Sequence, residues 1–279
     1  MNKYKILAVI VVYNPELSLL LKNINALINN VDGLLIWNNS PNNFDAASLT
    51  KLYNKIVIKS CGKNIGISKA LNFAWHFARK HNYDYLLTMD QDSIWINLKG
   101  FLKKIQSFND KKNIFGPEYS ISKHTYINES ACRITSGMLV PIVILNEIGG
   151  YYNDFMIDGI DIELCYRARE HGYKVYNISG STLDHHAGLN IRCKFIWIHF
   201  YSDGYNPIRI NGIIRNHLII FKRYKIEWKI KCAILRRYYF IMPIKILLGE
   251  KNKIKKISAY FKGLYEGITD SYIELNKEL

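Results

Sequence analysis

Short apolar runs alternate with helical stretches along the first third of the chain. Four runs of aliphatic and aromatic residues occupy residues 6–12, 34–37, 56–58 and 85–89. Apolar residues recur at helical spacing in residues 17–28 and again in a segment that ends near Lys80. Runs without polar alternation are typical of parallel strands buried on both faces, and the stretches between them predict crossover helices. The pattern therefore predicts an α/β fold with a Rossmann-like, mostly parallel central sheet flanked by helices.

The alternation becomes less regular after Ser93. The expected elements are a helix over residues 98–108, a short strand over 114–117, a strand over 133–140, a helix ending at Gly149-Gly150 and a strand over 173–178. Beyond about Asn206 the sequence is helical and basic. We expect one α/β domain over residues 1–215 and a basic amphipathic helical region over residues 216–279.

Polar residues follow each predicted strand where it ends. They are Tyr13 and Asn14, Asn38 and Asn39, Asn64 and Lys69, and Asp90 and Asp92. Loops are ordinarily polar, but the carboxyl ends of parallel strands meet at one edge of a sheet, where ligands bind. The recurrence favours a nucleotide ligand. Neither G-x-G-x-x-G nor the P-loop pattern G-x-x-x-x-G-K-[ST] occurs, so the usual dinucleotide fingerprint and the P-loop are excluded.

The most pointed of these loops is Asp90-Gln91-Asp92-Ser93, where a buried apolar run ends in two carboxylates. Two acids so close together repel each other unless a cation lies between them. Carboxylate oxygens suit Mg²⁺ or Mn²⁺, which usually reach a protein through one or two carboxylates and the phosphates of a substrate. The alternative is an acidic turn that caps the helix that follows, since Asp and Ser are good N-caps.

A second acidic cluster spans residues 158–163. A helix is expected to begin between Asp158 and Asp161 and to end at Gly172. Asp161 would lie in its first turn, where the helix dipole favours a charged carboxylate. The alternative is that Asp158 or Asp161 only caps the helix, and Glu163 and Arg167 are spaced for a simple i,i+4 ion pair.

The charge balance of the 279-residue chain is unusual, with a formal net charge of +15. A surplus of that size implies an anionic partner such as nucleic acid, a phosphorylated substrate or an acidic membrane face. The five scattered cysteines lack a C-x-x-C pattern, which argues for reduced thiols in a cytosolic protein and against a zinc site. No apolar run reaches the roughly 20 residues that span a bilayer.

Basic residues in the last quarter of the chain are interleaved with aromatic and aliphatic residues. This mixture suits an amphipathic surface on anionic lipid, so we expect a cytoplasmic protein, peripheral on the inner face of the cell membrane. Nucleic acid is not an expected partner because no nucleic-acid-binding motif is present. A solvated basic face on an ordinary helical subdomain is the remaining alternative.

Taken together, these stretches resemble the inverting family 2 glycosyltransferases with a GT-A fold, and most of all the bacterial rhamnosyltransferases of O-antigen and capsule biosynthesis. The resemblance extends from Val11 to Asn216. It is carried by Tyr13-Asn14-Pro15, Asn64-Ile65-Gly66, Asp90-Gln91-Asp92-Ser93, Thr135-Ser136-Gly137, residues 155–167 and His185-His186-Ala187-Gly188.

The resemblance implies a role for each matched residue. Asp92 and Asp90 would hold a divalent metal, Mg²⁺ or Mn²⁺, with His185 completing the coordination. Asp161 would be the catalytic base. The donor nucleotide would be lined by Tyr13, Asn14, Asn38, Asn64, Gly66, Lys69, Asp90 and Gln91. Substrate contacts would come from Ser136, Gly137, Glu163 and Arg167.

Two departures from the family pattern bear on specificity. The second strand commonly ends in an Asp that contacts the base, whereas this chain has Asn38, and an amide both donates and accepts. Ile210 and Asn211 replace an aromatic pair often found in the family stretch that ends in Arg215-Asn216.

The expected activity is metal-dependent, inverting transfer of a sugar, L-rhamnose from dTDP-rhamnose, to a hydroxyl of a lipid-linked cell-surface glycan. A glycosidase would instead need two carboxyls flanking the scissile bond. Two other hypotheses stay open: a UDP-hexose or galactofuranose transferase of the same fold, and a non-catalytic, membrane-associated partner in polysaccharide assembly.

Overall fold

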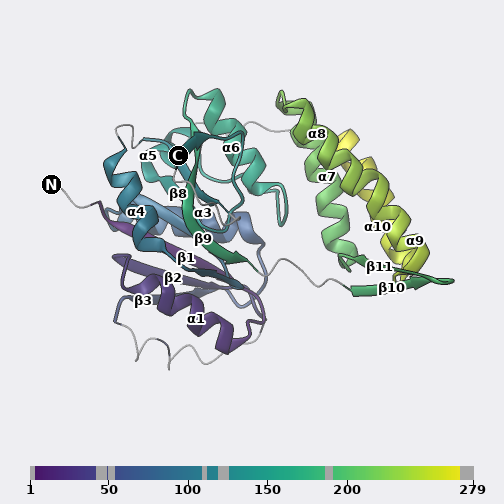
Figure 1. Cartoon of the computed structure of the whole chain (residues 1–279), viewed down its shortest axis with the longest axis horizontal. Coiled ribbons are helices and arrows are strands. Elements are labelled where there is room, and N and C mark those ends of the chain that lie inside the picture. The colour runs from purple at the N-terminus through teal and green to yellow at the C-terminus, as the bar shows by residue number, and fades with distance from the viewer. Residues whose placement is uncertain are drawn as a thin grey trace. The chain divides into compact units, whose positions relative to one another are not determined.

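The computed structural model describes residues 4–41, 49, 54–108, 112–118, 126–185 and 191–270. The chain forms two compact units, shown in Figure 1. Unit 1 contains the described residues up to Met156 and those from Ile160 to His185. Unit 2 contains Ile157–Gly159 and the described residues from Ile191 onward.

Unit 1 is built on a central sheet with nine strands in the part of the chain that is described. The path through the sheet is β3-β2-β1-β4-β8-β6-β9-β5, and β7 pairs with β9. The strands are β1 (Ile6–Val12), β2 (Gly33–Asn38), β3 (Ile56–Ser60), β4 (Tyr85–Asp90), β5 (Ser93–Trp95), β6 (Ile114–Glu118), β7 (Ile127–Glu129), β8 (Met138–Pro141) and β9 (Val175–His185).

The first four strands are parallel, and their register brings their ends to one level. Val12 lies opposite Asn38, and Val11 lies opposite Asp90. The polar residues that follow β1, β2 and β4 therefore gather at one edge of the sheet, as the sequence predicts.

The other half of the sheet is mixed: β8 runs antiparallel to β4 and β6, whereas β6 and β9 are parallel. The predicted α/β class with a central sheet between helices is confirmed. The strand predicted over residues 133–140 begins only at Met138, because the preceding residues turn to bond with β4.

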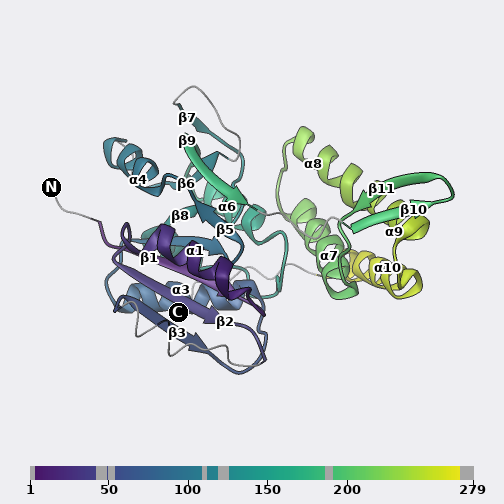
Figure 2. The same cartoon turned by 60° about the horizontal axis from the view of Figure 1, so that its bottom comes forward.

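Helices cover both faces of the parallel strands, as Figure 2 shows for α1 (Leu17–Ile28) and α3 (Ile67–Lys80). Leu20, Ile24 and Leu27 repeat at helical spacing and pack in one core with alternate residues of β1. α4 (Leu98–Ser107) adds Phe101 to that core. The opposite face of β1 and β4 is covered by α3. Two further helices, α5 (Ile142–Ile148) and α6 (Ile160–Glu170), complete the unit.

Unit 2 consists of a hairpin followed by helices. The elements are β10 (Ile191–Phe195), β11 (Ile198–Ser202), α7 (Pro207–Arg223), α8 (Trp228–Ile234), the π-helical turn η1 (Leu235–Ile241), α9 (Met242–Gly249) and α10 (Lys253–Thr269). Helices α7 and α10 lie close together because Gly263 and Gly267 face α7, where a Cβ atom would approach Asn211 O to 2.7 Å and Leu218 Cβ to 2.8 Å. No helix in the described ranges is long and apolar enough to cross a bilayer.

The predicted domain boundary between residues 215 and 216 falls inside α7, a continuous helix that belongs wholly to unit 2. The segment Ile157–Gly159 joins the same unit through side chains of α7. The Asn216 amide donates to the carbonyls of Ile157 and Asp158 at 3.0 and 2.8 Å. The Arg209 guanidinium binds both carboxylate oxygens of Asp158 at 2.8 and 3.0 Å. The hydrogen bonds that assign Ile157–Gly159 to unit 2 join residues 51 to 59 positions apart in the sequence. No change of composition at residues 157–159 marks this assignment.

All five cysteines are free thiols, as expected from their spacing.

His217 offers a test of packing in unit 2. It is buried between Tyr238 and Phe221, and burial lowers its pKa from 6.5 to about 4, against a smaller opposing effect of Asp158. Since the unfolded chain binds the proton more readily, this group favours folding above pH 6.5 and loses that contribution as the pH falls towards 4. Replacing His217 with Phe should remove an acid-sensitive contribution on the order of 3 kcal/mol.

We expect the H217F variant to unfold at a lower pH than the wild type when circular dichroism is followed during acid titration. The exposed His81 serves as the matched control, and H81Q should leave the midpoint in place. An unchanged midpoint in H217F would show that His217 does not carry the acid sensitivity.

Candidate active site

The turn after β4 is fixed to the end of β1 by Gln91. Its side-chain oxygen accepts the Tyr13 N–H at 2.8 Å, and its amide donates to the Tyr13 carbonyl at 3.3 Å. The Asn23 amide of α1 donates to the carbonyl of Asp90 at 2.8 Å. Gln91 thus uses its polar atoms to hold the turn, whereas the sequence assigned it to the nucleotide.

Asp92 is half-buried in this turn and makes no side-chain hydrogen bond or ion pair with another described residue. Helix α4 is capped by Asn97, whose side chain accepts the Gly100 N–H at 2.9 Å. The alternative that Asp90-Gln91-Asp92 serves to cap a helix is therefore excluded. A carboxylate that is half out of water and has no such partner fits a hard divalent cation.

His185 lies in β9, where its backbone is paired with Ser93, the residue after Asp92. The chain at His185 is thus brought beside the acidic turn from a distant part of the sequence. The described residues contain no preassembled cluster of three metal-ligating side chains. The fit of Mg²⁺ or Mn²⁺ here rests on the donor chemistry of Asp90 and Asp92.

The loops after β1 and β2 are joined through Ser40. The side-chain oxygen of Asn38 accepts the Ser40 N–H at 2.8 Å, and the Ser40 hydroxyl accepts the Asn14 N–H at 2.7 Å. Asn38 is buried, so its amide oxygen shapes the loop. Tyr13, with 50% of its surface exposed, and Asn14 are both open to a ligand.

Asn39 holds the next loop in place. Its amide oxygen accepts from Trp37 Nε1 at 2.9 Å and from the Ile65 N–H at 3.2 Å, and its nitrogen donates to the Gly66 carbonyl at 3.2 Å. The sequence marked Asn39 only as one more polar loop residue. A buried amide with several bonds to one loop is a positioning group, and its role depends on contacts 26 residues away.

The loop that leads into α3 holds three residues predicted to bind the nucleotide. Asn64 accepts the Gly66 N–H at 2.9 Å. Gly66 has a φ of +84°, and a Cβ atom there would lie 2.8 Å from Met156 Cγ. Gly66 is therefore required by backbone conformation and close packing. Lys69 is exposed in the first turn of α3, which carries no acidic residue.

Residues 135–137 are bonded to β4 directly beside the acidic turn. The Thr88 hydroxyl donates to the Thr135 carbonyl at 2.5 Å, and the Gly137 N–H donates to the Thr88 carbonyl at 2.8 Å. The Asp90 N–H donates to the Ser136 hydroxyl at 3.2 Å. Ser136 is fully buried, so in this structure it supports β4, whereas the sequence assigned it to the substrate. Gly137, with a φ of +80°, packs against Pro117 in the same supporting layer.

Asp161 lies half-buried in the first turn of α6, as predicted, and its Oδ1 accepts the Ile162 N–H at 2.9 Å. One turn further, on the same side of the helix, Cys165 is fully buried with its Sγ 3.9 Å from the Arg133 carbonyl. Burial raises the pKa of this thiol, which is therefore neutral. Arg133 lies two residues before the segment 135–137, which bonds to β4. The short stretch from Arg133 to Gly137 therefore contacts both α6 and β4.

The Asp158 carboxylate is paired with Arg209 and does not cap α6. The alternative that Asp158 is only a helix cap is therefore excluded.

Glu163 and Arg167 form a buried, two-pronged ion pair, with bonds of 2.8 and 2.9 Å between the guanidinium and the two carboxylate oxygens. Arg167 also donates to the carbonyls of Ile148 and Gly150. Glu163 has no exposed surface. The structure contains the i,i+4 ion pair, which was the alternative interpretation, and this pair holds the turn after α5. Both side chains are buried, whereas the resemblance implied that they contact the substrate.

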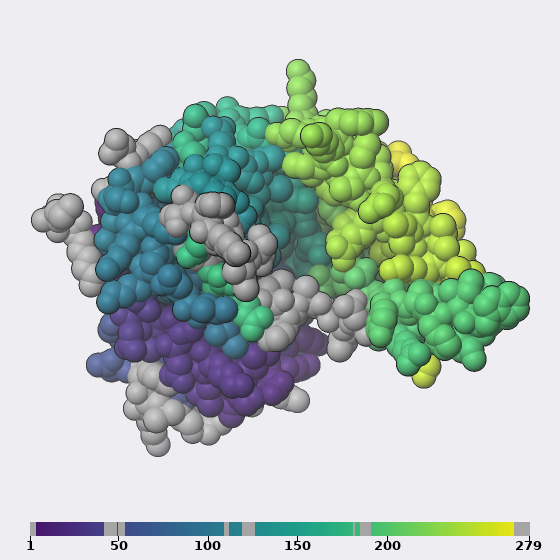
Figure 3. Space-filling model, viewed as in Figure 1, coloured from purple at the N-terminus to yellow at the C-terminus, as the bar shows by residue number. Residues whose placement is uncertain are grey.

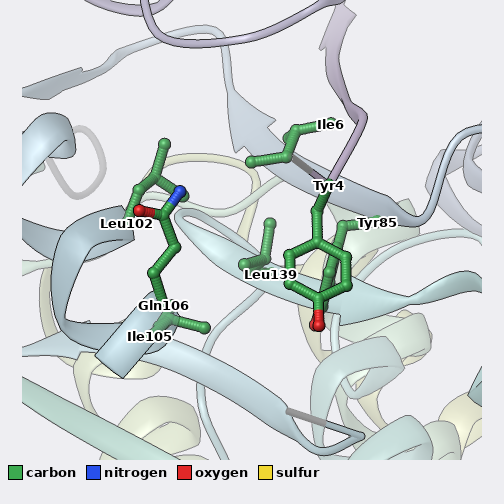
Figure 4. A pocket seen from close by; sticks show the side chains of 7 residues that line it. All are labelled: Tyr4, Ile6, Tyr85, Leu102, Ile105, Gln106 and Leu139. Carbon is green, nitrogen blue, oxygen red and sulfur yellow. The ribbon is translucent and has the colours of Figure 1, made fainter. Parts of the chain in front are cut away.

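A small cavity lies between α4 and the sheet (Figure 4). It is lined by Tyr4, Ile6, Tyr85, Leu102, Ile105, Gln106 and Leu139. Ile6 and Tyr85 begin β1 and β4, so the cavity belongs to the edge of the sheet opposite Asp90. Its lining contains no charged residue.

Comparison with models of protein families finds no match. Among characterised proteins, the chain is 25% identical to the dTDP-rhamnosyl transferase RfbF of Shigella flexneri over 294 aligned residues. The alignment covers 94% of this chain and 95% of that protein.

Two solved structures resemble the chain at the level of fold. GalNAc-T7, crystallised with UDP, GalNAc and Mn²⁺, matches 95% of the chain with a TM-score of 0.63 and 14% identity. TarS of S. aureus, residues 1–349 in complex with UDP, matches 95% with a TM-score of 0.61 and 14% identity. The chain covers 80% of that TarS fragment, but only 56% of GalNAc-T7 and 48% of the longer TarS chain.

These neighbours have the GT-A fold, and the mostly parallel sheet flanked by helices described above is that fold. The chain is similar over nearly its whole length to a rhamnosyl transferase.

The buried pair Glu163–Arg167 yields a test of its role. Replacing Arg167 with Met leaves the Glu163 carboxylate buried without its main partner, and we expect a loss of about 3–5 kcal/mol in the free energy of unfolding. The double variant E163L/R167M removes both charges and should recover most of that loss. Urea unfolding measures both effects. A substrate-binding role would instead raise KM and leave the unfolding free energy of R167M unchanged.

Proposed function

We propose that the chain is an inverting rhamnosyltransferase that moves L-rhamnose from dTDP-rhamnose to a hydroxyl of a growing cell-surface glycan. The proposal is supported by similarity to a dTDP-rhamnosyl transferase along nearly the full length of both proteins. At the site itself, the observation that carries it is the position of Asp161. This carboxylate lies in the first turn of α6, and one turn further Cys165 contacts the carbonyl of Arg133. Arg133 precedes residues 135–137, and Ser136 of that segment bonds to the end of β4.

The chemistry follows from the ionisation of Asp161. A carboxylate in the first turn of a helix is stabilised in its charged form, which is the form that accepts a proton. Asp161 takes the proton of the acceptor hydroxyl while the hydroxyl oxygen attacks the anomeric carbon. The bond from that carbon to the nucleotide diphosphate breaks on the opposite face, so the configuration inverts.

Asp90 and Asp92 would supply oxygen ligands to Mg²⁺ or Mn²⁺, with His185 as the expected third ligand. When bound, such an ion offers positive charge to the diphosphate leaving group, so no protein acid is needed there. Tyr13 presents an exposed ring at the end of β1, suited to stacking on the base. Lys69 and the start of α3 add positive charge near the diphosphate.

The acceptor in this proposal is lipid-linked, and the protein works peripherally at the inner face of the cell membrane. The formal charge of +15 supports a partner surface made of anionic lipid. A lipid-linked acceptor would concentrate enzyme and substrate at one surface.

A second candidate is a UDP-sugar transferase of the same fold. It is favoured by the UDP and UDP-GlcNAc complexes of TarS, which share the fold at low identity. A thermal-shift screen of dTDP-rhamnose, UDP-glucose, UDP-GlcNAc and UDP-galactofuranose with Mn²⁺ separates the two. We expect the largest stabilisation from dTDP-rhamnose. If no nucleotide stabilises the protein, the non-catalytic alternative gains support.

Asp161→Asn should abolish transfer and preserve donor binding. The amide keeps the shape of the side chain but does not accept the proton, so kcat should fall by roughly 10²–10⁴-fold. Donor binding is measured by thermal shift and turnover by release of dTDP. Glu170→Gln, on the last turn of the same helix, is the matched control and should turn over normally. Near-normal turnover by D161N would remove Asp161 from the role of base.

Asp92→Ala should lose the metal-dependent part of donor affinity. Calorimetric titration with dTDP in the presence and absence of Mn²⁺ measures that part directly. In the wild type, Mn²⁺ should strengthen dTDP binding, whereas D92A should bind dTDP equally weakly with or without it. Asp154→Ala, an exposed acid outside the turn, should behave like the wild type. A full Mn²⁺ effect in D92A would exclude Asp92 as a ligand.

A further inference from the structure

The hairpin β10–β11 of unit 2 ends in an apolar tip that the rest of its unit leaves uncovered. The four consecutive residues Phe195-Ile196-Trp197-Ile198 form the tip. Ile196, Trp197 and Ile198 expose 60%, 79% and 55% of their surface. Figure 3 shows the hairpin as a green projection beside the yellow-green helices, and Figures 1 and 2 show it reaching past the end of α9.

The base of the hairpin is firmly attached. Cys193 and Ser202 are buried, and Cys193 packs on Gly249 at the end of α9, where a Cβ atom would come within 2.6 Å. The Ser202 hydroxyl donates to the carboxylate of Glu250, which is buried and paired with Lys256. The hairpin is thus held by its base, and its tip contributes little to the packing of the unit.

The tip sequence is also unfavourable for the turn that it forms. Phe195 and Ile198 are the last paired residues, so Ile196 and Trp197 make a two-residue turn. Ile196 has a φ of +55°, a conformation in which a β-branched residue is strained and which Asn or Gly adopts easily. A sequence chosen for folding would place Gly or Asn at this position. The apolar side chains at this turn therefore point to a use outside the fold.

The residues around the tip are basic, which favours an anionic partner. The outward face of the hairpin carries Arg192 and Lys194, which are paired with Tyr201 and His199, and residues 191–202 include no acid. Beyond α9, which packs on the hairpin, Lys251, Lys253 and Lys255 are exposed. Exposed aromatic and aliphatic groups bordered by Lys and Arg match the interface of an anionic membrane.

A second protein is a poorer match to the same surface. Specific protein interfaces need roughly 1,000 Å² or more of buried area, which a tip of four residues does not supply, and they are depleted in Lys. A bilayer requires only shallow insertion of a few side chains together with nearby positive charge.

We propose that the tip of the β10–β11 hairpin inserts into the interfacial layer of an anionic membrane, with Trp197 at headgroup level and Arg192 and Lys194 on the lipid phosphates. This proposal rests on the membrane location given under the proposed function and assigns membrane contact to one element of the fold. It does not depend on which sugar is transferred.

The test replaces the tip and keeps the hairpin. The double variant I196N/W197G removes both apolar groups and places Asn, which adopts a positive φ readily, at the strained position, so the hairpin should still fold. Sedimentation with vesicles of phosphatidylcholine, alone or mixed with phosphatidylglycerol, measures binding. We expect the wild type to bind the mixed vesicles and I196N/W197G to bind them about tenfold or more weakly.

Two further variants separate the tip from its surroundings. Trp228, which is 73% exposed at the start of α8, is the matched control, and W228S should bind the mixed vesicles like the wild type. The variant R192Q/K194Q should bind more weakly and show a smaller effect of salt.

Equal binding of wild type and I196N/W197G to the mixed vesicles would overturn the proposal. So would equal binding of the wild type to neutral and mixed vesicles. A wild-type dimer that becomes a monomer in I196N/W197G, without change in vesicle binding, would assign the tip to a second copy instead. Donor-induced thermal shifts on the same variants report on the active site independently, so failure of either proposal is recognised separately.

Discussion

The hydrogen bonds between residues 135–137 and the end of β4 are the constraint on which the rest of the site depends. β4 delivers two carboxylates to the edge of the sheet, and their repulsion would push an unsupported turn apart. Thr88 and Asp90 are held by three bonds to this loop, and Gln91 and Asn23 hold the other side. Cys165 of α6 contacts the carbonyl of Arg133, two residues before this loop begins. A rigid scaffold of this kind allows charged groups to be in place before the substrate arrives.

Many polar side chains near the site make hydrogen bonds to other protein groups and are not free to bind a ligand. Asn39 binds the loop before α3, Asn38 binds Ser40, and Glu163 binds Arg167. Buried polar groups that are fully bonded rigidify what they connect, whereas a half-bonded group would weaken it. This division leaves Tyr13, Lys69, Asp92 and Asp161 with exposed surface at the edge of the sheet. Those four side chains differ in chemistry: an aromatic ring, an ammonium group and two carboxylates.

The sequence predicts the sheet well because its signal is local. The apolar runs at residues 6–12 and 85–89 are strands β1 and β4, and the 17–28 periodicity is helix α1. The place of Asp161 in the first turn of α6 follows from local spacing too. The supporting roles of Ser136 and Asn39 could not be predicted in this way, because both residues have the same polar character as any loop residue. Their roles come from partners 46 and 26 positions away. The sequence analysis did not predict the hairpin of unit 2, although apolar residues alternate with Arg192 and Lys194 in β10, because its turn carries Ile196 and Trp197 where a two-residue turn ordinarily has Asn or Gly.

The three residues Ile157–Gly159 carry a consequence for any effort to divide the chain. They lie between segments of unit 1 but are bonded to Arg209 and Asn216 of α7. Unit 2 is thus not a tail that can be removed. A fragment that stopped after β9 would strip two backbone carbonyls and a carboxylate of their donors, two positions before α6 begins. Chimeras that exchange unit 2 between relatives must therefore move this tripeptide together with α7, because the unit is encoded in two separate stretches.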